Sequence, residues 1–247
     1  MNIAITAGGT SEHIDAVRAI TNTGTGTLAS IIANKFLDEY SDKFDKIFYI
    51  HTTNAKLPRE SEKVVLISTE DTMSVYNAVQ KVLTENKIDY FIHAMAISDY
   101  FVDFVSTADR VADSIIKSLT DLSVESPADI FLKGENRLDN SKKLSSDADN
   151  LVVVLRKTPK IIGSIKEFSP ATHLIGFKLL NNVTEEHLID VAYHLLQKNG
   201  CDYVVANDSA KITKEQHIAH IVDKDKKYTT VTSNNGIAEQ LGKIIFQ

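Results

Sequence analysis

The sequence is poor in cysteine, proline and tryptophan: its 247 residues include one Cys, four Pro and no Trp. With Cys201 alone, no disulfide can form within the chain, which excludes a disulfide-stapled fold and favours a reducing, cytoplasmic setting. No apolar run reaches the roughly 18 residues of a membrane-spanning helix. The segment 1–9 also lacks the basic and long apolar regions of a signal peptide. We therefore expect no membrane partner.

Positive charge is also scarce, because 27 Lys and Arg face 33 Asp and Glu, for a net charge of −6. Nucleic-acid binding depends on basic surface, so we expect no nucleic-acid partner. The hydrophobic content of 43% over this length is enough for a large core. We predict one domain over residues 1–247.

Short β-branched runs alternate with amphipathic helical patterns along most of the chain. Near-continuous apolar strands separated by helices indicate a parallel sheet covered on both faces. The stretch 217–233 instead predicts a β-hairpin, followed by a last helix from about residue 235. The expected fold is α/β, a doubly wound, Rossmann-like, mostly parallel sheet with a C-terminal β-hairpin. Strands are predicted at 2–6, 46–52, 63–68, 89–97, 150–155, 172–179 and 201–207, and the first two helices at 28–40 and 70–86.

Residues 103–149 form the least regular segment, with a helical pattern followed by a long polar run. They follow the C-terminal end of a predicted buried strand, where open α/β sheets place ligands and moving loops. A solvated loop and a mobile active-site flap are both compatible with this pattern.

The glycines of "TNTGTG" (21–26) match the start of a dinucleotide-binding fingerprint, which makes an NAD(P)-dependent oxidoreductase one alternative. That fingerprint needs a strand directly before its first glycine and an acidic residue at the end of the second strand. Here "IDAVRAIT" intervenes, and the second strand ends in His51, Thr52 and Thr53. "AGGT" (7–10) and "NTGTG" can instead offer backbone amides to a phosphate, although for each glycine alone a tight turn or a helix start is the favoured explanation.

Five segments taken together resemble phosphopantothenoylcysteine synthetase, a ligase of coenzyme A synthesis. They occur in the order of that family and span nearly the whole chain. The segments are "ITAGGTSEHIDAVRAITNTGTG" (5–26), "AMAISDY" (94–100), "KKLSS" with "LRKTPKII" (142–162), "IGFKLL" (175–180) and "CDYVVAND" (201–208).

The resemblance implies a two-step ligation in a stand-alone bacterial-type enzyme. The carboxylate of 4'-phosphopantothenate attacks the α-phosphate of a nucleoside triphosphate, pyrophosphate leaves, and the amine of cysteine then displaces the nucleoside monophosphate. The expected co-substrate is CTP, because the chain resembles the short stand-alone bacterial form. ATP is the alternative, because Lys178 stands where many CTP-using relatives have alanine, and "FKL" also occurs in the ATP-using branch. Mg²⁺ carried by the triphosphate and a homodimer are also implied.

The resemblance also assigns residues. It implies that Asn22 contacts the acyl-nucleotide linkage, although a helix N-cap is the local alternative. Lys143 would be the flap lysine that neutralises phosphate charge, and Lys142 is the alternative if the alignment shifts by one residue. Asp99 would bind the metal or a ribose hydroxyl. Ala96 would let the acyl intermediate approach closely. The positions that match nucleotide and phosphate contacts are Gly8, Gly9, Gly24, Gly26, Phe177 and Asn207.

A non-catalytic nucleotide-binding protein is a further alternative, since it would bind the triphosphate without turnover. A flavin-dependent decarboxylase is not indicated, because no flavin site is recognisable. His217 and His220, three apart in a predicted strand, point to opposite faces and are not expected to share a metal. We expect Cys201, at the start of an apolar strand, to be buried rather than nucleophilic.

Overall fold

The computed structural model describes residues 1–121, 129, 136–147, 149–213 and 216–247. Contacts divide the chain into two compact units. Unit 1 consists of Met1–Thr10, Thr23–Ile97 and Lys160–Gln247, and unit 2 consists of Ser11–Asn22 and Ser98–Pro159. The single domain and the irregular insertion over 103–149 stay predictions.

Unit 1 is built on one eight-stranded sheet with the strand order β12-β11-β10-β9-β6-β1-β4-β5. The six strands from β10 to β5 are parallel to their neighbours, whereas β11 and β12 are antiparallel additions. The expected mostly parallel α/β sheet with a C-terminal hairpin is confirmed. The strands are β1 (Asn2–Ala7), β4 (Lys46–Thr52), β5 (Val64–Thr69), β6 (Tyr90–His93), β9 (His173–Leu180), β10 (Tyr203–Ile212), β11 (His217–Asp223) and β12 (Tyr228–Val231).

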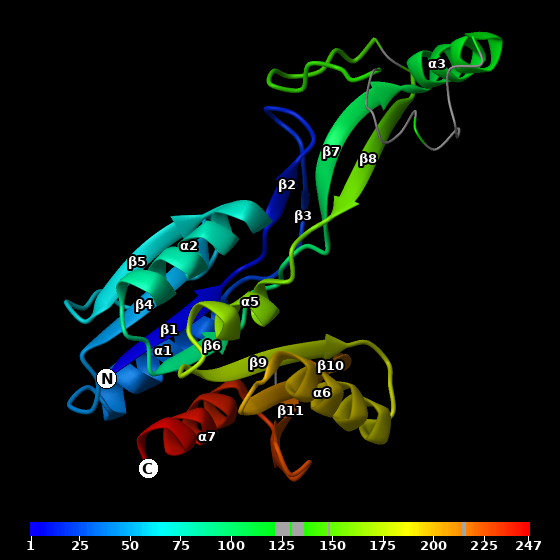
Figure 1. Ribbon diagram of the computed structural model, residues 1–247. Coiled ribbons are helices and arrows are strands. Elements are labelled where there is room, and N and C mark those ends of the chain that lie inside the picture. The colour runs from blue at the N-terminus through cyan, green and yellow to red at the C-terminus, as the bar shows by residue number, and fades with distance from the viewer. Residues whose placement is uncertain (122–128, 130–135, 148, 214–215) are drawn as a thin grey trace. The chain divides into compact units, whose positions relative to one another are not determined.

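Five helices cover the two faces of this sheet (Figure 1). α1 (Thr27–Glu39) and α7 (Asn234–Phe246) pack together on one face. α2 (Thr72–Glu85), α5 (Ile161–Phe168) and α6 (Glu185–Asn199) cover the other. Helices on both faces cover the central apolar strands, such as β1, in which residues 3–7 are buried.

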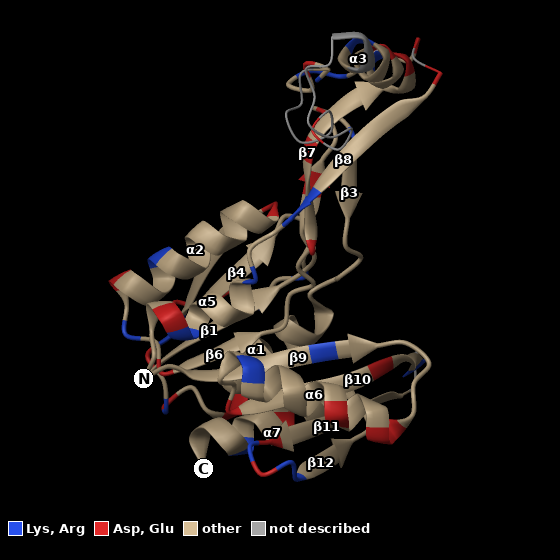
Figure 2. Ribbon diagram, turned by 45° about the vertical axis from the view of Figure 1, so that its right-hand side comes forward, with Lys and Arg blue, Asp and Glu red and all other residues tan. Residues whose placement is uncertain are grey.

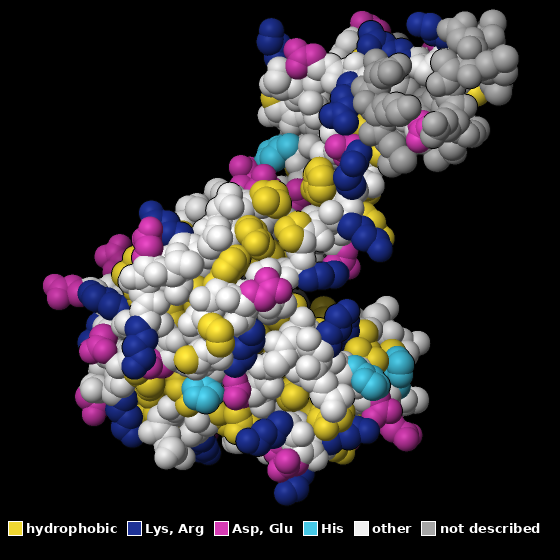
Figure 3. Space-filling model, viewed as in Figure 1, with side chains coloured by type: hydrophobic (Ala, Val, Ile, Leu, Met, Phe, Trp, Pro, Cys, Tyr) yellow, Lys and Arg dark blue, Asp and Glu magenta, His cyan; other side chains and the backbone are white. Residues whose placement is uncertain are grey.

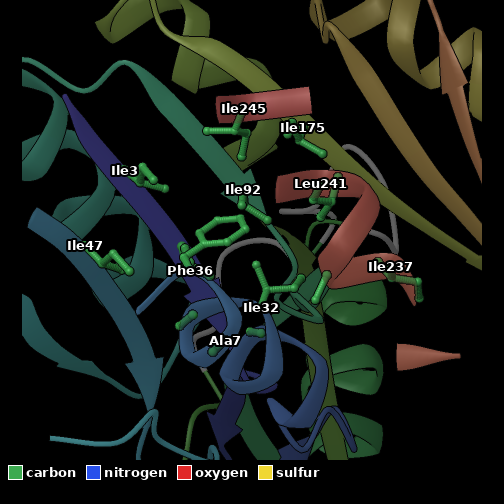
Figure 4. Packing of buried hydrophobic residues seen from close by; sticks show 14 of the residues in the cluster. Ile3, Ala7, Ile32, Phe36, Ile47, Ile92, Ile175, Ile237, Leu241 and Ile245 are labelled. Carbon is green, nitrogen blue, oxygen red and sulfur yellow. The ribbon is translucent and has the colours of Figure 1, made fainter. Parts of the chain in front are cut away.

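The alternating side chains of β1 show how one strand contributes to two hydrophobic clusters. Ile3 and Ile5 belong to the cluster under α1 and α7, whereas Ala4 between them belongs to the cluster under α2, α5 and α6. Successive side chains of a strand point to opposite faces, so one apolar run fills both layers. Figure 4 shows the first cluster, in which Phe36 of α1 packs among isoleucines of the sheet.

Charges of both signs lie mainly outside the central strands (Figure 2), and β1 and β6 carry none. Lys, Arg, Asp and Glu side chains are interspersed over the face of unit 1 drawn in Figure 3. This pattern agrees with the absence of a basic excess in the sequence. Among the described helices, none combines the length and apolar character that a bilayer crossing requires.

The described part of unit 2 contains two antiparallel strand pairs and the helix α3. β2 (Ser11–His13) pairs with β3 (Ala19–Thr21), and β7 (Tyr100–Thr107) pairs with β8 (Leu151–Lys157). α3 (Ala108–Asp121) follows β7. The expectation that 150–155 joins the parallel sheet is wrong, because β8 pairs with β7 in a separate sheet. The apolar run predicts a strand but does not identify the strand with which it pairs, because the two partners are far apart in the sequence.

Candidate functional site

The glycine motif lies at the point where the strand order of the sheet reverses. The chain runs from β1 outward to β4 and β5, and then crosses to the other side of β1 to form β6. Just beyond the ends of β1 and β6, Gly9 and Ala96 form a parallel bridge. The amide of Ala96 donates to the Gly8 carbonyl at 2.9 Å, and the amide of Thr10 donates to the Ala96 carbonyl at 3.1 Å. Open α/β sheets bind ligands at such a crevice.

Close contacts at this point require glycine at two positions. Gly8 has φ of 101°, and a Cβ there would lie 2.1 Å from Thr52 Oγ1. A Cβ on Gly24 would lie 2.5 Å from the Gly8 carbonyl oxygen and 3.1 Å from Ala96 Cβ. The two glycine segments and Ala96 therefore lie too close together for a side chain at Gly8 or Gly24. The structure brings Gly8, Gly9, Gly24, Gly26 and Ala96 together, as expected if they form one binding site.

α1 begins next to this cluster, with Gly26 as its N-cap. Glycine has no side-chain oxygen with which to cap the first amides of the helix, and a bound phosphate can take that place. The loop before the helix is held by the Lys56 amide, which donates to the Thr25 carbonyl at 2.9 Å. Because Gly26 is the cap, Asn22 is not, and the local alternative for Asn22 is excluded.

The dinucleotide fingerprint is not completed by this geometry. β2 and β3 lie between the end of β1 and the glycines before α1. β4, the second strand of the parallel series, ends at Thr52 and offers no carboxylate to a ribose. Both features that the NAD(P) alternative requires are missing from this part of the described chain.

Phe177 and Asn207 lie on adjacent strands and share one face of the sheet. In the register of β9 and β10, Phe177 is opposite Val205, and Asn207 follows two residues later. Phe177 and Val205 belong to the cluster under α1 and α7, and alternation places Asn207 on that same face. Both residues lie toward the carboxyl ends of strands parallel to β1 and β6, which is the edge that carries the glycine cluster.

A chain of hydrogen bonds fixes the amide of the buried Asn207. Its Nδ2 lies 2.7 Å from His217 Nε2, and His217 Nδ1 lies 2.6 Å from Asn234 Oδ1 at the start of α7. An amide oxygen only accepts, so the His217 proton is on Nδ1, and Nε2 accepts from Asn207. Burial lowers the pKa of His217, which favours the neutral ring that this arrangement needs. Sequence reasoning tested His217 only as a metal ligand and missed this contact.

The remaining candidates belong to unit 2. Asn22 directly follows β3 and is half-buried, whereas Asp99, Lys142 and Lys143 are exposed. The Asp99 carbonyl accepts from the amide of Thr158 at 3.1 Å. Part of the expected flap, residues 122–128, 130–135 and 148, lies outside the described residues.

The two histidines of β11 contact different partners. Within β11, His217 contacts Asn234, whereas His220 Nδ1 lies 2.9 Å from Thr230 Oγ1 on β12. Across the described ranges, no group of three or more His, Cys, Asp or Glu could hold a metal ion. Cys201 is buried as expected, and burial raises the pKa of its thiol to about 12, which disfavours the nucleophilic thiolate.

His93, at the end of β6, gives the fold a pH dependence. Its ring is buried with Nδ1 3.1 Å from Thr6 Oγ1, and burial lowers its pKa to about 4. In the unfolded chain a histidine titrates near pH 6.5. Between these values only the unfolded state binds the proton, so stability falls as the pH drops, by up to about 1.4 kcal/mol per pH unit. Urea unfolding midpoints from pH 7 to 4 measure this slope.

Replacing His93 by Gln is expected to flatten that slope. His194→Gln, at an exposed position on α6, is the control and should keep the wild-type slope. An unchanged slope in His93→Gln would show that the acid sensitivity arises elsewhere, such as at His217 or His220, whose pKa values burial also lowers.

Comparison with known proteins gives one consistent family. The model of the DNA/pantothenate metabolism flavoprotein C-terminal domain matches residues 1–139 and 105–247. The bifunctional coenzyme A biosynthesis protein CoaBC of Thermococcus kodakarensis is 28% identical over 97% of this chain and 49% of its own length. This chain thus spans about half the length of the curated relatives that it matches.

Comparison with solved structures points to the same family. The DNA/pantothenate metabolism flavoprotein from Streptococcus pneumoniae superposes with a TM-score of 0.82 at 36% identity, covering 99% of this chain and 98% of that one. A Cab2 complex with phosphopantothenate-cysteine shares the fold at 16% identity, with a TM-score of 0.66 over 98% of this chain and 85% of that one.

Proposed function

Because this chain belongs to the family of the DNA/pantothenate metabolism flavoprotein C-terminal domain, we propose that it is a phosphopantothenate–cysteine ligase. The observation that carries the proposal is the cluster of Gly8, Gly24 and Ala96 at the switch point of the sheet. Backbone amides at a helix start suit a triphosphate, and the missing ribose carboxylate argues against NAD(P). The complex of Cab2, which has the same fold, contains the expected product class.

The proposed reaction activates a carboxylate. An oxygen of the 4'-phosphopantothenate carboxylate attacks the α-phosphorus of the triphosphate, and the bond to the β-phosphate oxygen breaks to release pyrophosphate. The amine of cysteine then attacks the acyl carbon, the amide forms, and the nucleoside monophosphate leaves with the bonding electrons. An unactivated carboxylate is inert to amines, so the triphosphate supplies the leaving group.

In this scheme the chain contributes positioning and charge stabilisation. The glycine segments hold phosphate oxygens with backbone amides, and Ala96 leaves room for the acyl group. The Asn22 amide donates to the oxygen that gains charge at the acyl-nucleotide linkage. The Lys143 ammonium neutralises the phosphate as pyrophosphate leaves. Phe177 packs on the base, and Asn207, held by His217, hydrogen-bonds to its edge.

Mg²⁺ fits this proposal as an ion carried by the substrate. The described residues form no cluster able to cage a metal, and Mg²⁺ usually binds one or two carboxylates together with substrate phosphates. Asp99, an exposed carboxylate, is the residue that we propose for it. When bound, the ion offsets negative charge on the phosphates.

The proposal names CTP as the nucleotide, because the chain resembles the stand-alone bacterial form. ATP stays the alternative, because Lys178 departs from the alanine of many CTP-using relatives. Lys178 lies on β9 next to Phe177 and opposite Ala206 of β10. The homodimer implied by the resemblance belongs to the same proposal, and a molar-mass measurement in solution tests it.

Pyrophosphate release tests the function. The purified protein is supplied with Mg²⁺ and 4'-phosphopantothenate, with CTP or ATP, and with or without cysteine. Release that requires phosphopantothenate supports carboxylate activation and identifies the nucleotide. Nucleotide binding without release would favour the non-catalytic alternative. Oxidation of NAD(P)H by the protein would revive the oxidoreductase.

Replacing Lys143 by Gln is expected to slow phosphopantothenate-dependent pyrophosphate release by about tenfold to a hundredfold. Removal of one rigidly held transition-state donor typically slows a reaction by about 10²- to 10³-fold. We expect a loss at or below that range, because the side chain of an exposed lysine is held less rigidly. Lys142→Gln is the matched control, since it removes the same charge one residue away. If Lys142→Gln alone impairs release, Lys142 is the residue that acts.

A further inference from the structure

One buried carboxylate in unit 2 has no role in the scheme above. Asp15 lies in the turn between β2 and β3, and its exposed fraction is 1%. Its Oδ1 accepts from the amides of Val17 and Arg18 at 2.9 and 2.8 Å. Its Oδ2 accepts from Arg18 Nε at 3.0 Å, from Arg18 Nη2 at 2.5 Å, and from the amide of Leu144 at 3.1 Å. The last contact spans 129 positions of sequence.

The contact with Leu144 is one of three that hold the same short segment to the β2–β3 turn, and in the second Arg18 Nη2 donates to the Leu144 carbonyl at 3.5 Å. Four residues earlier, Asn140 Nδ2 donates to the Ile14 carbonyl at 3.2 Å. The Leu144 side chain is buried as well. Only residues 141–143 lie between the two anchors, and they include the exposed pair Lys142 and Lys143. Both ends of the lysine loop are thus tied to one turn.

Asp15 is held in its charged form, which these contacts require. Arg18 is the main cause that keeps the pKa of Asp15 well below its ordinary value; the backbone amides add to this effect, and burial opposes it. Below the ordinary pKa near 3.9, the stabilising contribution of the carboxylate declines as the pH falls toward the depressed value. At neutral pH the carboxylate accepts every one of these bonds. An amide in its place would turn N–H groups toward donors.

The same hairpin leads to the other proposed catalytic residue. β3 pairs with β2 from Ala19 to Thr21, and Asn22 is the next residue. Asp15 therefore connects two segments distant in sequence, one bearing the lysines and one bearing Asn22, inside unit 2. Groups that act on one reacting centre must keep their geometry, and a misplacement of about 1 Å can cost about 100-fold in rate.

We propose that Asp15 is a positioning residue, whose carboxylate fixes the Lys142–Lys143 loop on the β2–β3 hairpin and so sets the geometry between the lysine and Asn22. This role rests on the proposed ligase function. Asp15 touches no substrate and acts through Lys143. The loop that carries the lysine is therefore an anchored part of the segment expected to form the flap.

Asp15→Asn tests this role. The kcat for phosphopantothenate-dependent pyrophosphate release is expected to fall by about 10- to 100-fold, with the KM for the triphosphate changed less than about threefold. Hydrogen exchange at the Leu144 amide is expected to become faster. Asp139→Asn is the matched control, because Asp139 is exposed in the same segment and its carboxylate accepts from Ser141. It should retain wild-type kcat and wild-type exchange at Leu144.

A double variant separates positioning from loss of folding. If Asp15 acts through the lysine, Asp15→Asn combined with Lys143→Gln is little slower than the slower single variant, because residues acting as a unit are not additive. Losses that multiply, or an unchanged kcat in Asp15→Asn, would overturn the positioning role while the ligase function stands. An inactive wild-type protein would instead remove the ligase function, and this role with it.

Discussion

Replacing Asn22 by Asp is expected to lower kcat by about 10²- to 10³-fold while leaving nucleotide affinity within a few-fold of wild type. That range is typical for removal of one fixed donor to a developing oxyanion. A carboxylate has nearly the size of an amide but donates nothing, and its charge repels the phosphate and the acyl oxygen. Both effects grow as the acyl-nucleotide forms, so the loss falls on turnover.

Single-turnover formation of the acyl-nucleotide and equilibrium nucleotide binding measure the two quantities separately. Asn77→Asp is the control for the added charge, because Asn77 is exposed on α2. Equal losses in turnover and binding would contradict the catalytic role. They would mean that Asn22 supports the nucleotide site as a whole. A variant with normal turnover would remove Asn22 from the mechanism.

The second large effect is expected from Gly24→Ala. The new Cβ would lie 2.5 Å from the Gly8 carbonyl oxygen and 2.9 Å from its carbon, and these are backbone atoms that cannot swing aside. The two glycine segments must separate, at a cost of about 1–3 kcal/mol in unfolding free energy, as in other overpacked sites. Because the segments form the proposed phosphate cradle, nucleotide affinity is expected to fall by more than about tenfold, the equivalent of 1.4 kcal/mol.

Gly163→Ala is the matched control for this substitution. A Cβ there finds its nearest atom, Asn199 Oδ1, at 3.5 Å, and the residue lies in α5. Alanine in a helix is favoured over glycine by about 0.5–1 kcal/mol, so this variant should be as stable as wild type or more stable. Urea unfolding and a nucleotide titration are run on both variants. A folded Gly24→Ala that binds triphosphate normally would place the phosphate site elsewhere.

Local pattern was sufficient for most of unit 1. The run at 46–52 coincides with β4, and the polar turn between two short strands was correctly recognised as the β11–β12 hairpin. β2 and β3 were not predicted, because three-residue strands carry too little pattern. β8 was recognised as a strand but given the wrong sheet, since its apolar run is compatible with either sheet.

In the candidate site too, local features were predictable from sequence and long-range contacts were not. Gly8 and Gly24 could be grouped from sequence, because each lies where a predicted element ends or begins, and the family resemblance added Ala96. The contact of His217 with Asn207 crosses a bulged strand pair, and that of Asp15 with Leu144 joins segments 129 positions apart. Neither leaves a periodic signal. The segment "IDAVR" was part of the family resemblance, yet only the structure gives Asp15 a partner.

The longer segment of unit 2, Ser98–Pro159, begins and ends with residues that contact each other. β6 and β9 are neighbours in the sheet although all of 98–159 lies between them. Inside unit 2, Thr158 Oγ1 donates to the Ser98 carbonyl at 2.7 Å, beside the β7–β8 pairing. Once that pairing forms, the connection from β6 to β9 shortens to a crossover of ordinary length that contains α5. Loop-closure entropy grows slowly in any case, by about 0.6 kcal/mol per doubling of length. The length of the insertion therefore adds little to the cost of folding the sheet.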